Sequence, residues 1–381
     1  MLEILLAAAL AILVAWALCP VVIAARLWDN PDCERKQHRA PTPSAGGLAA
    51  AAGFALALTA LTVWPNARWA DLLEGDAFQR TGFALVAAFA TLLIGLLDDL
   101  RNLNARIKFA IMAALSFYVA IFVARAEVLP VGGALVVEFG IVFGVLGSAL
   151  WVFTLTNTVN FMDGANGLAM GSMAVGFAGL GILGAIHGAP HVAVISACAV
   201  GSLVGFLMWN FPAGKVFAGD AGALFAGMLA AATGLLLVQD GGVSPVIPPL
   251  LFFPLLADVL LTLAHRVKHR RAVLDAHREH LYQVGMRAGV SHARTSITYW
   301  IATAHCVAVA VAASFGPRLA PPSVFAPQPG DVSEVQVALT QAVAWVAALA
   351  PIIALAVLAA VSIHVSNRVR RFAAARGLDK P

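Results

Sequence analysis

Long apolar runs separated by short polar connections dominate the pattern of positions along this chain. A helix needs roughly 17–25 such residues to cross a bilayer. The pattern therefore predicts an all-α, polytopic transmembrane helix bundle. We expect about eleven spans, at approximately 2–26, 44–65, 81–97, 107–124, 136–156, 168–187, 191–209, 221–238, 246–265, 296–315 and 338–366. The boundary of the fifth span is ambiguous, because "LPVGGALVVEFG" before it could also form a short hairpin outside the bilayer.

The composition supports a membrane protein. Of the 381 residues, 61% are hydrophobic and 12% are charged, whereas soluble domains carry about 25% charged residues. A single integral-membrane domain then accounts for residues 1–366, followed by a basic tail at 367–381. The first run lacks a basic start and a cleavage site, so we interpret it as a retained span. The 4 cysteines are scattered and indicate neither a zinc site nor a disulfide framework.

The basic residues predict an orientation. With eleven spans, 20 of the 24 Lys and Arg residues fall on one side of the membrane. Connections rich in Lys and Arg stay cytoplasmic, so we expect the N-terminus outside and the tail inside. The net charge of +4 follows from this orientation and from contact with anionic lipid, and it requires no nucleic-acid partner.

The most informative polar segment is "TNTVNFMDGANGLAMG", residues 156–171. Asn157, Asn160, Asp163 and Asn166 recur at intervals of three, which would place them roughly on one face of a helical turn. Amide and carboxylate side chains are costly beside hydrocarbon unless they line a wet site. A polar loop with ordinary helix caps is the alternative, since Asn and Asp favour such positions.

Two adjacent acids, Asp98 and Asp99, directly follow an apolar run in "LLIGLLDDLRNLNARIKF". Paired carboxylates at a membrane interface suit a divalent cation or the acceptance of a proton from phosphate. Lys108 follows nearby and could hold a phosphate or extend toward the interface. The alternative interpretation of the acid pair is a solvated helix end.

A third acid, Asp220, lies between two glycines in "WNFPAGKVFAGDAGALFAG", at the expected start of the eighth span. An acid at a helix N-terminus can also serve as a cap. Asn210 and Phe217 lie just upstream. Phe217 could stack on a base, and an aromatic anchor at the interface is the alternative.

The largest connection on the predicted cytoplasmic side carries His277 and His280, which would share a face if this segment were helical. Basic residues before them could grip a diphosphate, although orientation explains part of that charge. No third ligand has spacing suited to zinc. Asp258, inside the ninth run, is a candidate functional residue, or it pairs with a basic residue of a neighbouring helix.

Together, the segments between residues 29 and about 285 resemble the polyprenyl-phosphate N-acetylhexosamine-1-phosphate transferase superfamily, glycosyltransferase family 4. Five motifs occur in the order typical of that family. The resemblance implies transfer of a sugar 1-phosphate from a UDP-sugar to undecaprenyl phosphate, giving undecaprenyl-diphospho-sugar and UMP. It also implies a magnesium requirement, with manganese as an alternative ion, and a location in the bacterial inner membrane with a cytoplasmic active site. It leaves a homodimer open.

The resemblance also implies roles for individual residues. Asp220 matches the magnesium-binding aspartate. Asp98 and Asp99 match a pair assigned to metal or to activation of the lipid phosphate, and Lys108 resembles a phosphate-side lysine. The remaining matches contact the nucleotide or the diphosphate: Asn160, Asp163, Asn166, Asn210 and Phe217 for the nucleotide-sugar, and His277 and His280 for the diphosphate.

Several positions depart from the family pattern. Asn102 and Asn166 stand where acids are common, and Ala223 stands where Ser is common. The histidine motif lacks adjacent histidines, which favours the branch that starts surface glycans over the peptidoglycan branch. A transporter or lipid flippase is the alternative function, but it should carry polar groups near the bilayer midplane and on both sides. Here the polar groups crowd one side.

Overall fold

The computed structural model describes residues 2–25, 28–29, 42–63, 75–132, 135–272, 277–315 and 334–377. It confirms the all-α membrane bundle. Among the described residues, ten helices are long and apolar enough to span a membrane. They are α1 (Leu2–Ala24), α2 (Gly46–Val63), α4 (Asp76–Arg101), α5 (Ala105–Phe122), α6 (Gly140–Met162), α7 (Leu168–Ile186), α8 (Pro190–Asn210), α9 (Gly219–Gly241), α13 (His292–Ser314) and α14 (Glu334–Ala375).

The segment predicted as the ninth span, 246–265, differs from the prediction. It forms two helices, α10 (Ile247–Leu251) and α11 (Phe253–Lys268), and is not one of the ten candidate spans. Proline has no N–H to donate, and a proline lies in the first turn of each helix. In addition, α11 buries a polar face of Asp258, Thr262 and Arg266, spaced at four-residue intervals.

The fifth span begins a few residues later than the approximate start predicted at 136. Residues before α6 form an antiparallel hairpin of β3 (Val128–Gly132) and β4 (Leu135–Glu138), with Val128 opposite Glu138. The hairpin left open by the sequence is therefore present, and α6 runs from Gly140 to Met162. Three further short elements lie within the described residues: the paired strands β1 (Trp28–Asp29) and β2 (Thr42–Pro43), and the helix α12 (Leu281–Arg287).

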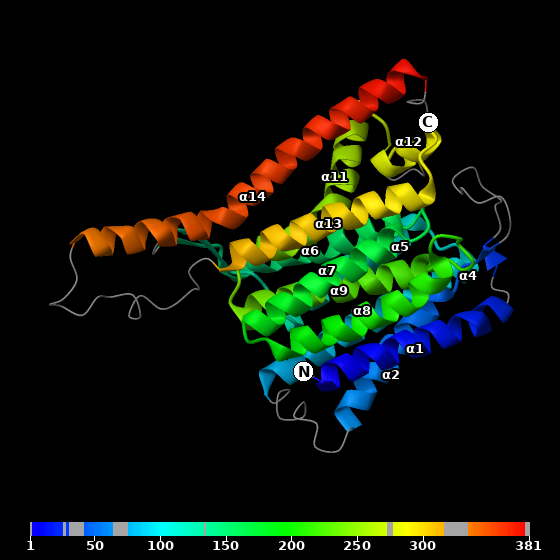
Figure 1. Cartoon of the computed structure of the whole chain (residues 1–381), viewed down its shortest axis with the longest axis horizontal. Coiled ribbons are helices and arrows are strands. Elements are labelled where there is room, and N and C mark those ends of the chain that lie inside the picture. Colours follow the sequence, from blue (N-terminus) through cyan, green and yellow to red (C-terminus); the bar gives the residue numbers. More distant parts are fainter. Residues whose placement is uncertain are drawn as a thin grey trace.

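The helix α9 forms the centre of the bundle, in contact with α2, α4, α6, α7 and α8. Figure 1 shows α7, α8, α9 and α13 running side by side, with α1 along one flank. On another side, α14 crosses α11 and α13 and extends past them. It continues to Ala375, so the first residues of the predicted tail are helical.

Small residues let two helices approach the first turn of α9 closely. A Cβ atom added at Gly47 would lie 2.3 Å from the Cα atom of Gly222, and one added at Gly95 would lie 2.5 Å from the Cα atom of Ala221. Helices in membranes associate through such small residues. The contacts therefore fix the ends of α2 and α4 beside Asp220.

Candidate active site

The polar residues gather first at the N-terminus of α9, where Asp220 lies in the opening turn. The Lys108 Nζ atom of α5 lies 2.7 Å from the Asp98 Oδ2 atom of α4 and also contacts the Asp220 carboxylate. The Asp98 Oδ1 atom accepts a hydrogen bond of 2.7 Å from the Leu103 N–H group. The structure thus brings together the acid, the acid pair and the lysine that the sequence singled out.

Asp99 occupies a different environment from Asp98. Its Oδ1 atom accepts from the Asp220 N–H group at 3.0 Å, and its Oδ2 atom accepts from the Ala221 N–H group at 3.1 Å. The first N–H groups of a helix lack partners within the helix, and a negative charge is stabilised there. Asp99 therefore caps α9 and holds Asp220 in place.

The C-terminal end of α6 completes this cluster. Asn160 Nδ2 donates to the Asp220 Oδ1 atom at 2.8 Å, and Asp163 follows as the residue that ends α6. Burial raises the pKa of Asp163 well above its usual value, and the charges of Asp220 and Asp99 raise it further. We name Asp98, Asp99, Asp163, Asp220, Lys108 and Asn160 the carboxylate cluster.

The carboxylate cluster fits a hard divalent cation. Magnesium usually takes one or two protein carboxylates and completes its shell with water and substrate phosphates. The Asp98 Oδ2 and Asp220 Oδ2 atoms contact the same Lys108 Nζ atom, so two carboxylate oxygens converge on one place. Within the described ranges, no group of three or more His, Cys, Asp or Glu side chains is arranged to hold a metal ion, so substrate oxygens would supply the remaining ligands.

The predicted amide residues downstream are held by backbone groups. Both ends of the buried Asn210 amide are used, with Oδ1 accepting from the Gly167 N–H group at 2.6 Å and Nδ2 donating to the Val216 carbonyl at 2.8 Å. Asn166 Nδ2 donates to the Pro212 carbonyl at 3.0 Å. Asn210 and Asn166 thus tie the loop after α6 to the loop before α9.

Phe217 lies in the loop that enters α9. Its N–H group donates to the Pro43 carbonyl at 2.8 Å, and its carbonyl accepts from the Gly46 N–H group at 2.9 Å. These bonds fix the backbone of Phe217 at the start of α2 and three residues before Asp220. The backbone of Phe217 therefore lies close to the first turn of α9, and stacking of its ring on a base stays a prediction.

His277 and His280 lie together, although the predicted helix is absent. Residues 277–280 form no helix, and α12 begins at Leu281. The two rings nevertheless lie 4.9 Å apart between centroids. The expectation of a shared helical face was wrong, because Asp258 of α11 binds the N–H groups that follow His280, and Glu279 within the segment binds two arginines.

Asp258 is the first of these acids and is 2% exposed. Its carboxylate accepts from the Leu281 and Tyr282 N–H groups at 2.7 and 3.1 Å, and from the Tyr299 hydroxyl at 2.5 Å. Its Oδ1 atom lies 3.6 Å from the His280 Nδ1 atom. Asp258 therefore caps α12 and lies beside His280. Its partner is the histidine that precedes α12, and not a basic residue within a neighbouring helix as the alternative had it.

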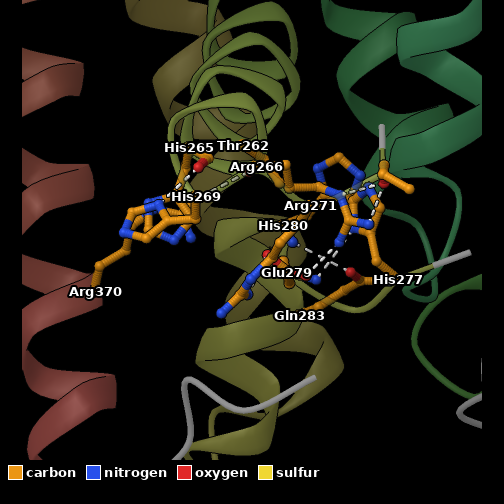
Figure 2. A network of polar contacts seen from close by, with 11 residues as sticks. Thr262, His265, Arg266, His269, Arg271, His277, Glu279, His280, Gln283 and Arg370 are labelled. Atoms are coloured by element: carbon orange, nitrogen blue, oxygen red, sulfur yellow. Dashed lines mark hydrogen bonds and ion pairs between the residues drawn. The ribbon is translucent and has the colours of Figure 1, made fainter. Parts of the chain in front are cut away.

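Glu279 is the second buried acid and lies between two arginines (Figure 2). Arg266 Nη1 contacts the Glu279 Oε1 atom, and Arg271 Nη1 lies 2.9 Å from the Oε2 atom. Burial opposes ionisation of Glu279, but the charges of Arg266 and Arg271 outweigh it and lower the pKa of the carboxyl group. Arg370 reaches α11 from α14 and donates to the Thr262 hydroxyl at 3.1 Å.

We name residues 277–280 the histidine segment. It meets the carboxylate cluster at the end of α6. The Phe161 ring stacks on His280 with centroids 6.1 Å apart, and the Phe161 carbonyl accepts from the Tyr282 hydroxyl at 3.2 Å. The preceding residue, Asn160, binds Asp220. One turn of α6 therefore links the two parts of a single site.

Sequence reasoning missed several residues that shape this site. Glu279, Tyr282 and Tyr299 were not singled out, and Arg266 was named only among the basic residues that could grip a diphosphate, although all four hold the segment that contains His277 and His280. One local signal was present, because Asp258, Thr262 and Arg266 recur every four residues and mark a polar helical face. The partners on other elements carry no such signal.

Comparison with known proteins places these residues in a wider context. A family described as glycosyl transferase family 4 matches residues 81–238. A probable undecaprenyl-phosphate N-acetylglucosaminyl 1-phosphate transferase of Bacillus subtilis is 25% identical over 276 residues, covering 72% of this chain and 73% of the relative. A decaprenyl-phosphate N-acetylglucosaminephosphotransferase of Mycobacterium leprae is 31% identical over 296 residues, covering 70% and 72%. A phospho-N-acetylmuramoyl-pentapeptide-transferase of Geobacillus kaustophilus is 31% identical over 282 residues, covering 69% and 81%.

Proposed function

The chain belongs to glycosyl transferase family 4, and from this premise we propose that it transfers an N-acetylhexosamine 1-phosphate from a UDP-sugar to undecaprenyl phosphate. It is a membrane-embedded phosphotransferase of the sugar-1-phosphate type. The products of the proposed reaction are undecaprenyl-diphospho-sugar and UMP. This would be the first membrane step in the synthesis of a surface glycan.

In the proposed reaction, an oxygen of the lipid phosphate attacks the phosphorus that bears the sugar. A new P–O bond forms there, and the bond from that phosphorus to the oxygen bridging to the uridine phosphate breaks, so UMP leaves with that oxygen. The charge on the transferred phosphoryl group must be stabilised by groups held in place beforehand. Lys108 supplies a fixed positive charge between Asp98 and Asp220.

The contacts suggest different tasks for the paired acids. Both oxygens of Asp99 already bind the N-terminus of α9, so we assign Asp99 to positioning. Asp98 faces Lys108 and is the better candidate to receive a proton from the lipid phosphate. Asp220 would hold Mg²⁺, which when bound neutralises phosphate charge and acts as a Lewis acid.

We place the reaction on the cytoplasmic side of the bacterial inner membrane. The observation behind this assignment is the excess of Lys and Arg in the connections that carry the site residues. Phosphoryl transfer between a soluble nucleotide and a membrane lipid needs a site at the bilayer surface. The ends of α4, α6 and the start of α9 provide one.

The convergence of Asp98, Lys108, Asn160 and Asp220 from four helices is the observation that carries this proposal. The test is to incubate the purified protein with undecaprenyl phosphate and a panel of UDP-sugars, and to measure UMP release and lipid-linked product. We expect release that depends on the lipid, stops when EDTA is added, and returns with Mg²⁺. No lipid-dependent UMP release from any donor would overturn the proposal.

A further inference from the structure

Three side chains on one face of α13 bind the backbone of the loop that follows Asp163. The Asn166 N–H group donates to the His292 Nδ1 atom at 3.2 Å. The Ser296 hydroxyl donates to the Asn166 carbonyl at 2.7 Å, and Trp300 Nε1 donates to the Gly167 carbonyl at 2.9 Å. His292, Ser296 and Trp300 are spaced at four-residue intervals, so they lie one above another along the helix.

The opposite side of the same loop is held just as closely. The Gly167 N–H group donates to the Asn210 Oδ1 atom at 2.6 Å. The Trp300 ring lies 4.7 Å from the Phe211 ring between centroids, and a Cβ atom at Gly171 would lie 2.1 Å from Trp300 side-chain atoms. The loop is therefore held by α13 through Trp300 and by the end of α8 through Asn210.

We infer that His292, Ser296 and Trp300 are positioning residues, a strut that fixes the loop carrying Asp163 and so sets the affinity for the nucleotide-sugar. This inference rests on the proposed function of that site. A loop ordered before binding loses less conformational freedom when the ligand arrives, and this strengthens binding without new contacts. His292 contributes as a hydrogen-bond acceptor at Nδ1, a role that an amide oxygen can also fill.

The substitution His292→Leu tests the strut, because it removes the hydrogen-bond acceptor and replaces the imidazole with an apolar side chain of similar size. A lost hydrogen bond corresponds to roughly a fivefold to tenfold change in an equilibrium constant, so we expect the KM for the UDP-sugar to rise by about that factor. The kcat should stay within about twofold, since the loss affects substrate and transition state equally. The KM for undecaprenyl phosphate should not change.

Two further variants separate positioning from general damage. His292→Asn keeps an acceptor near the Nδ1 position and should restore the KM. His305→Leu is the matched control, because exposed His305 lies on the same helix and its Nδ1 atom bonds to the Ile301 carbonyl of that helix and not to the loop. A higher KM in His292→Asn, or the same rise in His305→Leu, would overturn the inference.

Hydrogen exchange without substrate tests the strut independently of activity. Mass spectrometry of a peptide containing Asn166 should show faster amide exchange in His292→Leu than in the unmodified protein, and unchanged exchange in His292→Asn. Equal exchange in His292→Leu and the unmodified protein would overturn the strut even if transfer occurs. Faster exchange together with no UMP release from the unmodified protein would instead overturn the proposed function.

Discussion

The two ends of α9 carry ionic clusters built on the same pair of helices, and the clusters differ in charge balance. At the C-terminal end, Asp240 binds Arg80 of α4 at 2.6 Å and His191 of α8 at 2.9 Å. At the N-terminal end, Asp220 meets Lys108 together with Asp98 and Asp99 of α4. One acid has two basic neighbours at the first end, whereas several acids share one lysine at the second.

This difference distinguishes an ion-pair cluster that stabilises the fold from a reaction site. We name Asp240, Arg80 and His191 the balanced cluster. Its single acid, Asp240, has two basic partners, and the Asp240 side chain is 14% exposed. In the carboxylate cluster the Asp220 side chain is 30% exposed, and the acids outnumber the lysine. Like charges held close together are unfavourable unless a cation joins them. We therefore interpret the surplus of carboxylates as the mark of a cation and phosphate site.

Removing the charge of one acid at each end of α9 should reveal the largest difference in activity between the two clusters. Asp220→Asn retains the size of the side chain but removes its charge. Loss of a metal ligand that supports Lewis-acid catalysis removes several kcal/mol of transition-state stabilisation, and each 1.36 kcal/mol is about tenfold in rate. We expect UMP release to fall on the order of a thousandfold.

Asp240→Asn is the control for that measurement. It makes the same chemical change on the same helix, at the end away from the carboxylate cluster, and its activity per folded molecule should stay within about twofold. Comparable turnover in Asp220→Asn and Asp240→Asn would remove the distinction between the two ends of α9.

Phe217→Ala should produce the next largest effect at the carboxylate cluster. Loss of a stacked base costs about 1–3 kcal/mol, so the KM for the UDP-sugar should rise roughly fivefold to a hundredfold. Phe217→Trp should preserve most of the affinity. Phe83→Ala is a suitable control, because Phe83 lies near the other end of α4, where its ring packs on Phe122 at 5.6 Å. Unchanged KM values in Phe217→Ala would make Phe217 an interfacial anchor.

The balanced cluster should instead respond in stability. Asp240→Asn removes the charge that binds Arg80 and His191, and hydrogen bonds to charged groups contribute about 1.5–3 kcal/mol. Partial exposure reduces this value, so we expect the apparent melting temperature in detergent to fall by a few degrees. A melting temperature of Asp240→Asn equal to that of the unmodified protein would contradict the stabilising role of this cluster.

The smallest expected effect concerns pH and Asp163. Its folded-state pKa lies well above the ordinary value because of burial and the charges of Asp220 and Asp99. Ionisation of such a group costs folding free energy, so stability falls as pH rises from about 4, the ordinary carboxyl pKa, through the raised folded-state pKa. Asp163→Asn should melt at the same temperature as the unmodified protein near pH 4 and a few degrees higher at pH 8. Parallel melting curves across this range would contradict the assignment.

The sequence predicted the fold well because long apolar runs have few alternatives in a bilayer. Asp98, Asp163 and Asp220 could be expected to meet for the same reason, since each follows or precedes a span on one predicted side. The prediction was incomplete at 246–265, where the segment divides into α10 and α11 and an apolar average concealed the polar face of α11. It also failed at His277 and His280, where periodicity was read as a helix.

The partners within the site could not be predicted from local spacing. Asp99 binds backbone groups of Asp220 and Ala221, more than 120 residues away in the chain. Asp258 caps α12 across 23 residues, and His292 binds a loop 126 residues earlier. Such bonds depend on how helices pack, and a single sequence does not record which acid faces which N-terminus.

The enclosure of α9 has a further consequence for how the protein responds to its membrane. Every residue from Ala221 to Leu237 is buried, so the hydrocarbon tails touch the surrounding helices and not α9. A change in bilayer thickness is accommodated by tilting or local thinning at lipid-facing helices. Because Asp220 begins the shielded helix, its depth is insulated from such changes. A change in acyl-chain length should therefore alter the tilt of the outer helices while turnover changes little.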